Sequence, residues 1–292
     1  MISAPIKLTR EHFRTFQRNG FVVLGGVLDH DTIKVARERF ESLFAGKFET
    51  GLCPDEWNWR PDRDAPDLTR QICNAWKSDR VIASIVLRAD IGRACADLKG
   101  WPGARINQDN VIWKPPGAKA LGFHQDDSYQ RWIQPAEIVT CWITLDDTYA
   151  DQGTIEYVPG SHNWPVAEEL RQFHAPENPL RELESSAAAA SIKDYEIVPI
   201  EVPAGTAIFH HGRIWHGSRN NKGLNQRRAV VAHCMSSEAK FHESNVNRIY
   251  SRYKRVGTVD IDESFFPILW AQRGEQGYRT HWLDDYMTGR SR

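Results

Sequence analysis

One short stretch of the chain brings together two side chains that bind metals. His124 and Asp126 lie two positions apart in the stretch 122–127, and on an extended segment residues i and i+2 project from the same face. Their imidazole and carboxylate groups can therefore occupy neighbouring positions around one metal ion. A second histidine from a distant strand would complete a facial triad, which leaves positions open on Fe(II) for an oxidant and a chelating cosubstrate. His216, 90 residues after Asp126, is the predicted third ligand.

An arginine follows the predicted third ligand at a spacing that suggests a second task. Arg227 comes 11 residues after His216, in a run that is expected to be a strand. A guanidinium group can bind a carboxylate through two parallel hydrogen bonds, a geometry that favours arginine over lysine. We predict that Arg227 anchors a dicarboxylate cosubstrate. The adjacent Arg228 should point to the opposite face of the strand and is the weaker candidate.

Other histidines compete for a place at the metal. His211, directly after His210, is the main alternative to His216 as the third ligand. An imidazole inside a strand is readily satisfied by hydrogen bonds through its two distinct nitrogens, so His216 is favoured. His162 follows a Pro-Gly-Ser turn and is expected to hold that loop.

The segment 105–235 resembles the phytanoyl-CoA dioxygenase family of Fe(II)- and 2-oxoglutarate-dependent oxygenases, which also includes ectoine hydroxylase. Besides the motifs above, the resemblance rests on Gly20–Leu24 and on Gly153–His162. The resemblance implies a mainly β protein with flanking helices, built on a double-stranded β-helix (a cupin-like jelly roll). It also implies that His124, Asp126 and His216 hold the iron, because they match the family's ligand positions.

The same resemblance implies how 2-oxoglutarate and O2 are used. The C5 carboxylate of 2-oxoglutarate would bind Arg227 with help from Ser218, while Trp142 would lie beside the cosubstrate. Asn110 is a weaker candidate for an amide that reaches it. Oxidative decarboxylation would release succinate and CO2, with hydroxylation of a C–H bond as the usual outcome. Halogenating relatives replace the carboxylate ligand by a small residue, so Asp126 argues against halogenation; desaturation, ring formation and epimerisation stay open.

The loop after the ligand pair is expected to border the substrate cavity. Asp127, Tyr129 and Trp132 follow the ligands directly and are predicted to contact substrate. Core packing is the alternative for each aromatic residue, but as a group they suggest an apolar or ring-containing substrate. The nearby loops are acidic and aromatic rather than basic, and the phosphates of a CoA thioester would need basic residues. We therefore expect a small free metabolite.

Two other classes of function remain open at this point. The same three ligands with zinc and a water molecule would suit a metal-dependent isomerase or hydrolase. A jelly roll that binds a ligand without catalysis, with structural histidines, is the other alternative. The isomerase or hydrolase does not need an arginine after the distal histidine, so Arg227 favours the oxygenase over it. Metal content after purification would separate the non-catalytic protein from both enzymes.

The elements that must position these residues form one predicted domain, 1–292. Helical patterns dominate residues 1–104, with helices expected at 9–20, from a cap at Asp29 or Asp31 to Gly46, and at 79–98, and with a strand at 21–24. Residues 105–236 are predicted to form the jelly-roll core, interrupted by an insert at 163–196 with a helix at 166–173. The aromatic segment 237–292 is expected to pack on the barrel. The predicted core strands are 106–113, 138–145, 154–158, 197–202, 207–211 and 228–235.

Composition limits the partners. The chain has 37 basic and 38 acidic residues, a net charge of -1, so no overall field favours binding to nucleic acid or to a membrane. Five scattered cysteines without a Cys-x-x-Cys pair support neither a disulfide framework nor a cysteine zinc site. No apolar stretch approaches the ~18 residues of a membrane span. We expect a cytoplasmic monomer or homodimer that acts on a small molecule.

Overall fold

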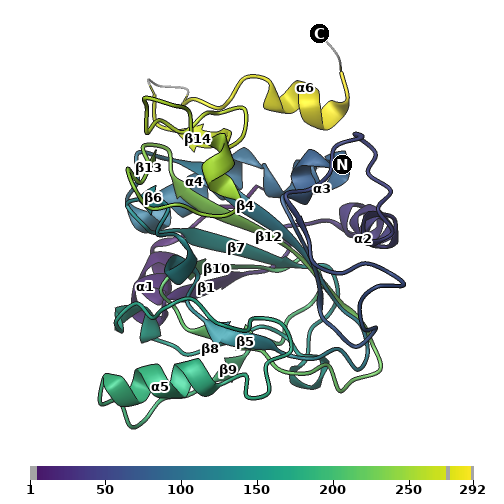
Figure 1. Cartoon of the computed structure of the whole chain (residues 1–292), viewed down its shortest axis with the longest axis vertical. Helices are drawn as coiled ribbons and strands as arrows, with labels where there is room; N and C mark the ends of the chain where they lie inside the picture. Colours follow the sequence, from purple (N-terminus) through teal and green to yellow (C-terminus); the bar gives the residue numbers. More distant parts are fainter. Residues whose placement is uncertain (1–4, 274–276, 291–292) are drawn as a thin grey trace.

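The computed structural model describes residues 5–273 and 277–290. Most of its strands form two facing antiparallel sheets, with helices packed on the outer side of the larger one (Figure 1), and β6 and β13 form a separate two-stranded sheet. This arrangement confirms the predicted mainly β jelly roll. The strands are β1 (Phe21–Leu24), β2 (Glu56–Trp57), β3 (Arg70–Cys73), β4 (Gly103–Lys114), β5 (Leu121–His124), β6 (Ile133–Gln134), β7 (Val139–Thr144), β8 (Glu156–Tyr157), β9 (Val198–Pro199), β10 (Ala207–His211), β11 (His216–Ser218), β12 (Arg227–Ser236), β13 (Lys240–Phe241) and β14 (Ile268–Ala271).

The larger sheet has the order β1-β10-β7-β12-β4-β3-β2, with β14 also paired to β4, and the smaller sheet has the order β5-β11-β8-β9. Strands β4 and β12 pair from Arg227 opposite Lys114 to Ser236 opposite Ala104. Because side chains alternate along a strand, β4 faces two cores. Ile112 packs in the core between the sheets, whereas Val111 packs in the core on the helical side.

Helices cover the outer side of the larger sheet. The side chain of Thr9 caps α1 by accepting from the backbone N–H of His12, and Gly20 ends it with a φ of 82°, a left-handed conformation that favours glycine. The apolar faces of α2, α3 and α4 share one core cluster with β4, β7 and β12. The helices are α1 (Arg10–Asn19), α2 (His30–Phe44), α3 (Arg80–Val86), α4 (Ala89–Lys99), α5 (Arg181–Ala189) and α6 (Leu283–Thr288).

Two helix predictions were wrong. The helix expected at 79–98 is divided into α3 and α4, because Arg88 has an extended backbone at the N-terminus of α4 and is held there by Asp90 and by the carbonyl of Val27. Residues 166–173 do not form a helix; the helix of the insert is α5, further along the chain. Its alanine run supplies the helix propensity.

The segment after β12 returns to the larger sheet, where β14 pairs with β4, and α6 follows at the top of Figure 1. Phe241, Tyr250 and Phe266 surround Trp132 in a separate aromatic cluster. Within the described residues, no helix is long and apolar enough to cross a membrane.

Candidate metal and cosubstrate site

Strand pairing brings the three predicted metal ligands together. In the smaller sheet, His216 of β11 lies directly opposite His124 of β5, and Asp126 begins the short helical turn that follows β5. The Nε2 atoms of His124 and His216 lie 3.3 Å and 3.5 Å from Oδ1 of Asp126. One donor atom from each residue fits within 4.8 Å of the others. Two imidazoles and one carboxylate at this spacing match the facial donor set of non-haem iron.

Backbone carbonyls hold both imidazoles in a metal-binding orientation. Nδ1 of His124 lies 2.9 Å from the carbonyl oxygen of Gly122, and Nδ1 of His216 lies 3.0 Å from that of Ile214. Since a carbonyl only accepts, each Nδ1 carries the proton and donates it. Each Nε2 therefore presents a lone pair toward Asp126, as metal-binding histidines do.

The second oxygen of Asp126 is occupied by hydrogen bonds from the larger sheet. The hydroxyl of Thr140 donates to Oδ2 at 2.7 Å, and Nε2–H of His210 donates to it at 3.1 Å. The hydroxyl of Tyr157 in turn donates to Nδ1 of His210 at 2.7 Å. These contacts leave Oδ1 as the oxygen that faces the two histidine ligands.

The electrostatics favour the forms that bind a metal. Burial acts to raise the pKa of Asp126, but the surrounding histidines, His216, His233, His124 and His210, outweigh it and hold this pKa well below its usual value. Burial and the neighbouring His124 lower the pKa of His216. An ionised carboxylate beside a neutral imidazole is the state required of metal ligands.

The structure separates the competing histidines from the metal ligands. His210 is engaged by Tyr157 and by the outer oxygen of Asp126. His211 projects to the other side of β10, where its Nε2 lies 3.0 Å from Nζ of Lys99 and its Nδ1 accepts from the backbone N–H of Arg213. His162 bonds the backbone carbonyl of Gln17.

A pair of buried cations lies on the same inner face of the larger sheet. Arg227 and Lys114 are directly opposite each other on β12 and β4, with 2% and 0% of their surfaces exposed. Arg227 donates to the carbonyl oxygen of Gly153 at 2.9 Å, and Lys114 donates to Oγ of Ser218 at 2.8 Å. Among the described residues, no carboxylate lies within ion-pair distance of either cation.

These cations are poised for an anionic ligand. Burial lowers the pKa of Arg227 to about 10, while burial and the nearby Arg227 lower the pKa of Lys114 well below its usual value. A buried charge without a counter-ion is costly, so a carboxylate would relieve the cost. Sequence reasoning missed Lys114, although a lysine that ends an apolar strand was a usable signal.

The remaining predicted cosubstrate residues lie near this pair. Ser218 is two residues beyond His216 on β11, or about 6.8 Å along a strand, between the metal ligands and the cations. The ring of Trp142 lies 5.7 Å from the guanidinium carbon of Arg227. Arg228 turns away and pairs with Asp146 at 2.7 Å, as alternation predicted.

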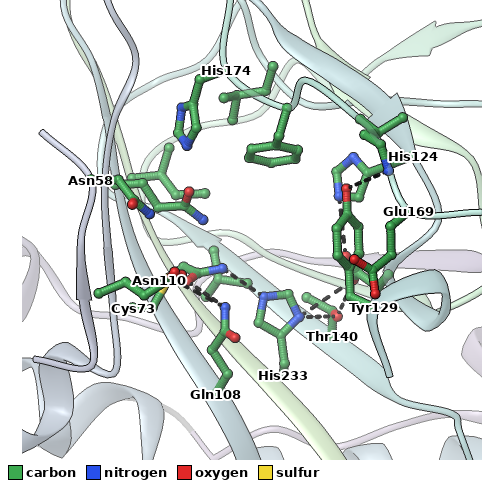
Figure 2. Close-up of a pocket in the computed structure, with 18 of the residues that line it drawn as sticks. Asn58, Cys73, Gln108, Asn110, His124, Tyr129, Thr140, Glu169, His174 and His233 are labelled. Carbon is green, nitrogen blue, oxygen red and sulfur yellow. Dashed lines mark hydrogen bonds and ion pairs between the residues drawn. The ribbon is translucent and has the colours of Figure 1, made fainter. Parts of the chain in front are cut away.

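One cavity of about 660 Å³ contains the metal ligands and Arg227. Asn110, the weaker cosubstrate candidate, lines it beside His233 and Gln108 (Figure 2). His233 also contacts Thr140. Nothing in the sequence singled out His233 or Thr140, because their roles depend on strand register. The insert reaches the cavity through residues 169–171 and 173–174, and the C-terminal segment reaches it through 246–250.

Only one of the three predicted substrate contacts lines the cavity. Tyr129 lines the cavity, with its ring 5.9 Å from that of His124. Asp127 and Trp132 are not among the lining residues. The helical turn directs Asp127 inward, where Oδ1 accepts from the backbone N–H of Ile138 at 2.9 Å and burial raises its pKa to about 8. Trp132 packs in the aromatic cluster of the C-terminal segment.

Comparisons with known proteins agree on one family and one fold. The sequence model of the phytanoyl-CoA dioxygenase (PhyH) family matches residues 16–229. The chain is 26% identical over 251 residues to the dioxygenase cdmD of Talaromyces verruculosus, covering 77% of this chain and 75% of that protein. It is 25% identical over 223 residues to the ectoine dioxygenase of Nocardia farcinica, covering 72% of each. The solved structure of SnoK, a non-haem alpha-ketoglutarate-dependent carbocyclase from nogalamycin biosynthesis, matches with a TM-score of 0.69 at 22% identity, covering 91% of this chain and 99% of that one. At that identity, the structural match establishes the fold.

Proposed function

Because the chain belongs to the phytanoyl-CoA dioxygenase family, and is therefore a non-haem iron, 2-oxoglutarate-dependent dioxygenase, we propose that its reaction takes place at His124, Asp126 and His216. These residues would hold the iron, which with O2 and 2-oxoglutarate supplies the oxidant for a substrate C–H bond. Succinate and CO2 are the products from the cosubstrate. We propose hydroxylation of a small organic metabolite as the outcome.

The chain's own residues would position the reactants. Arg227 and Lys114 would bind the C5 carboxylate of 2-oxoglutarate, and the hydroxyl of Ser218, which already accepts from Lys114, would donate to the same group. Trp142 would form one side of the cosubstrate pocket and exclude water from it. Asn110 lines the same cavity as the metal ligands, so it is a candidate to bind the substrate as well as the cosubstrate.

The observation that carries this proposal is the common orientation of the two histidines. Both Nδ1 atoms are tied to carbonyl oxygens two residues earlier in the chain, so both Nε2 atoms converge on one oxygen of Asp126. Histidines that only supported the fold would not need matched tautomers. The unpaired cations also weigh against an isomerase or hydrolase, because neither reaction needs a carboxylate anchor.

An anaerobic titration tests the proposal. Apo-protein is mixed with Fe(II) and then 2-oxoglutarate, and the weak visible charge-transfer band of the iron chelate is followed. We expect the band in the wild type and in His211→Ala, and its loss in His216→Ala. Iron binding without the band would refute the oxygenase assignment of this site, and loss of the band in His211→Ala would refute the choice of ligand.

We further propose that the protein works in the cytoplasm on a free metabolite. All five cysteines are free thiols, and four of them are buried, which suits a reducing compartment. Co-localisation of a tagged full chain with a cytoplasmic marker would support this placement, and a membrane-enclosed signal would contradict it.

A further inference from the structure

The wall of the cavity indicates what kind of substrate enters, and this inference rests on the proposed function. Gln71, Gln108, Asn110 and His233 line the cavity from β3, β4 and β12; we call these four residues the polar wall. Gln108 lies opposite His233 in the pairing of β4 and β12. On β3, Gln71 lies opposite Ile112, which shares a face of β4 with Asn110 by alternation. The polar wall is therefore continuous across three neighbouring strands.

Hydrogen bonds within the polar wall all run in one direction. An ionised carboxylate only accepts, so Thr140 donates to Asp126 and must accept from Nδ1–H of His233, 2.7 Å away. Nε2 of His233 is then an acceptor and takes an N–H from Asn110 at 3.0 Å. Oδ1 of Asn110 accepts in turn from Gln108 at 2.8 Å. Figure 2 shows Gln108, Asn110, His233 and Thr140 in this sequence.

This direction determines which groups remain for a ligand. Both ring nitrogens of His233 are engaged. Gln108 donates to Asn110 and to Sγ of Cys73, and its oxygen accepts from the hydroxyl of Tyr250. Asn110 has one N–H left, because only its other N–H bonds His233.

Gln71 is the fully available member of the polar wall. It is 7% exposed and lines the cavity. Within residues 5–273 and 277–290, no side-chain hydrogen bond engages its carboxamide. It therefore offers two N–H donors and one oxygen acceptor. The carboxamide faces the cavity and is not among the enclosed side-chain groups without a partner. A ligand that displaced water without offering matching groups would leave it unpaired at a cost in free energy.

The other charged side chains that line the cavity, near the polar wall and the insert, lie toward its solvent-exposed edge. Arg248 has 87% of its side chain exposed and pairs with Glu56 at 3.4 Å. Glu169 and Arg171 are also exposed. Apart from the metal ligands and Arg227, the buried residues that line the cavity carry no Lys, Arg, Asp or Glu side chain.

We propose that the substrate is a neutral molecule with closely spaced hydroxyl, carbonyl or amide groups, which bind to Gln71 and Asn110. Asn110 donates to one acceptor oxygen of the substrate, and Gln71 both donates and accepts. An anionic substrate would find no buried cation here apart from those that bind the cosubstrate. A hydrocarbon would leave the Gln71 carboxamide unpaired. This proposal adds polar groups to the apolar or ring-containing substrate expected from the aromatic residues of the sequence.

Fractionated metabolites test the substrate class. A small-molecule extract of the organism that encodes the chain is separated into a hexane fraction, fractions retained on anion and cation exchangers, and an aqueous neutral fraction. Each fraction is added to the Fe(II) and 2-oxoglutarate holoenzyme, and succinate is measured above the rate without extract. We expect stimulation by the neutral fraction. Stimulation confined to any other fraction, or none by the neutral one, would overturn the proposal.

Variants connect the stimulation to the polar wall. In Gln71→Leu, we expect at least about tenfold more neutral fraction to be needed for half-maximal stimulation, with an unchanged requirement for 2-oxoglutarate. Gln17→Leu makes the same chemical change on the exposed face of α1 and should match the wild type. An unchanged requirement in Gln71→Leu would overturn the role of this residue. The chelate band separates the two proposals, since its absence refutes the oxygenase site, whereas a normal band with the wrong fraction refutes only the substrate class.

Discussion

Strand β4 has buried ionisable side chains on both faces, and their surroundings differ. On the inner face, Lys114 stays beside a second buried cation, Arg227, without a carboxylate partner among the described residues. On the outer face, Asp109 is fully buried under the helices, and burial raises its pKa to about 7. Arg227 keeps its charge because a guanidinium group does not lose its proton in proteins, whereas a buried carboxyl group can take up a proton and lose its charge. This difference indicates that Lys114 and Arg227 bind an anionic ligand, whereas Asp109 has a structural role.

The metal ligands, which line the same cavity as Arg227, provide the largest test of this comparison. Asp126→Ala and His216→Ala should each reduce succinate formation by more than about 100-fold, because loss of outer metal-site partners alone commonly costs 10–100-fold. Bound iron, measured by metal analysis after gel filtration, should fall in parallel. His211→Ala is the matched control and should keep both. Iron retained at wild-type affinity by Asp126→Ala would contradict the assignment.

The next largest effect is expected at the buried arginine. Arg227→Ala should weaken 2-oxoglutarate binding by about 100-fold, or ~3 kcal/mol, as for other truncations of buried charge pairs. The 2-oxoglutarate concentration that gives half of the chelate band measures this change. Arg228→Ala removes an arginine that pairs with Asp146 outside the cavity, and its affinity should match the wild type. Equal losses in both variants would point to a general effect on β12.

Lys114 should contribute less than Arg227, because its ammonium group already donates to Ser218 and to the carbonyl oxygen of Arg219. Lys114→Met should weaken 2-oxoglutarate binding about tenfold, which lowers ligand-induced stabilisation by ~1.4 kcal/mol at saturation. Unfolding with and without 2-oxoglutarate gives this value. Lys119→Met changes a half-exposed lysine and serves as the control. If both variants keep the full stabilisation, the inner cation pair is not a cosubstrate site.

Long strands and helices were predictable from the sequence because their residue patterns extend over enough positions to be recognised. Strands β4, β7, β10 and β12 follow runs of β-branched and aromatic residues, and α1 lies between its predicted caps. Strands β5 and β11 contain only four and three residues, too few for a pattern. Their histidines were found through motif spacing instead.

Contacts that depend on register were not predictable. Thr140 and His233 are single polar residues inside buried strands, and they meet because β7 and β12 place them opposite each other. Lys114 became a candidate carboxylate-binding residue only when the strand register placed it opposite Arg227. Asp127 was misplaced for a related reason, since one short turn decides whether its side chain faces the cavity or the core.

The smallest effect is expected on the outer face, where Asp109 should make stability depend on pH. Oδ1 accepts from the backbone N–H of Trp76 at 2.9 Å, and Oδ2 has no partner among the described residues. The pKa of about 7 in the folded protein exceeds that of an unfolded aspartate, ~3.9, so the folded state binds more protons between these values. Stability should therefore fall as pH rises from about 4 to 7. Asp109→Asn keeps the oxygen acceptor but cannot titrate. The free energy of unfolding of both proteins is measured with denaturant at pH 5 and at pH 8. Over this range the value for the wild type should fall, relative to the variant, by about 1 kcal/mol or more. Parallel pH curves for the two proteins would show that Asp109 is ionised in the folded state, and the contrast between the faces of β4 would then fail on its outer side.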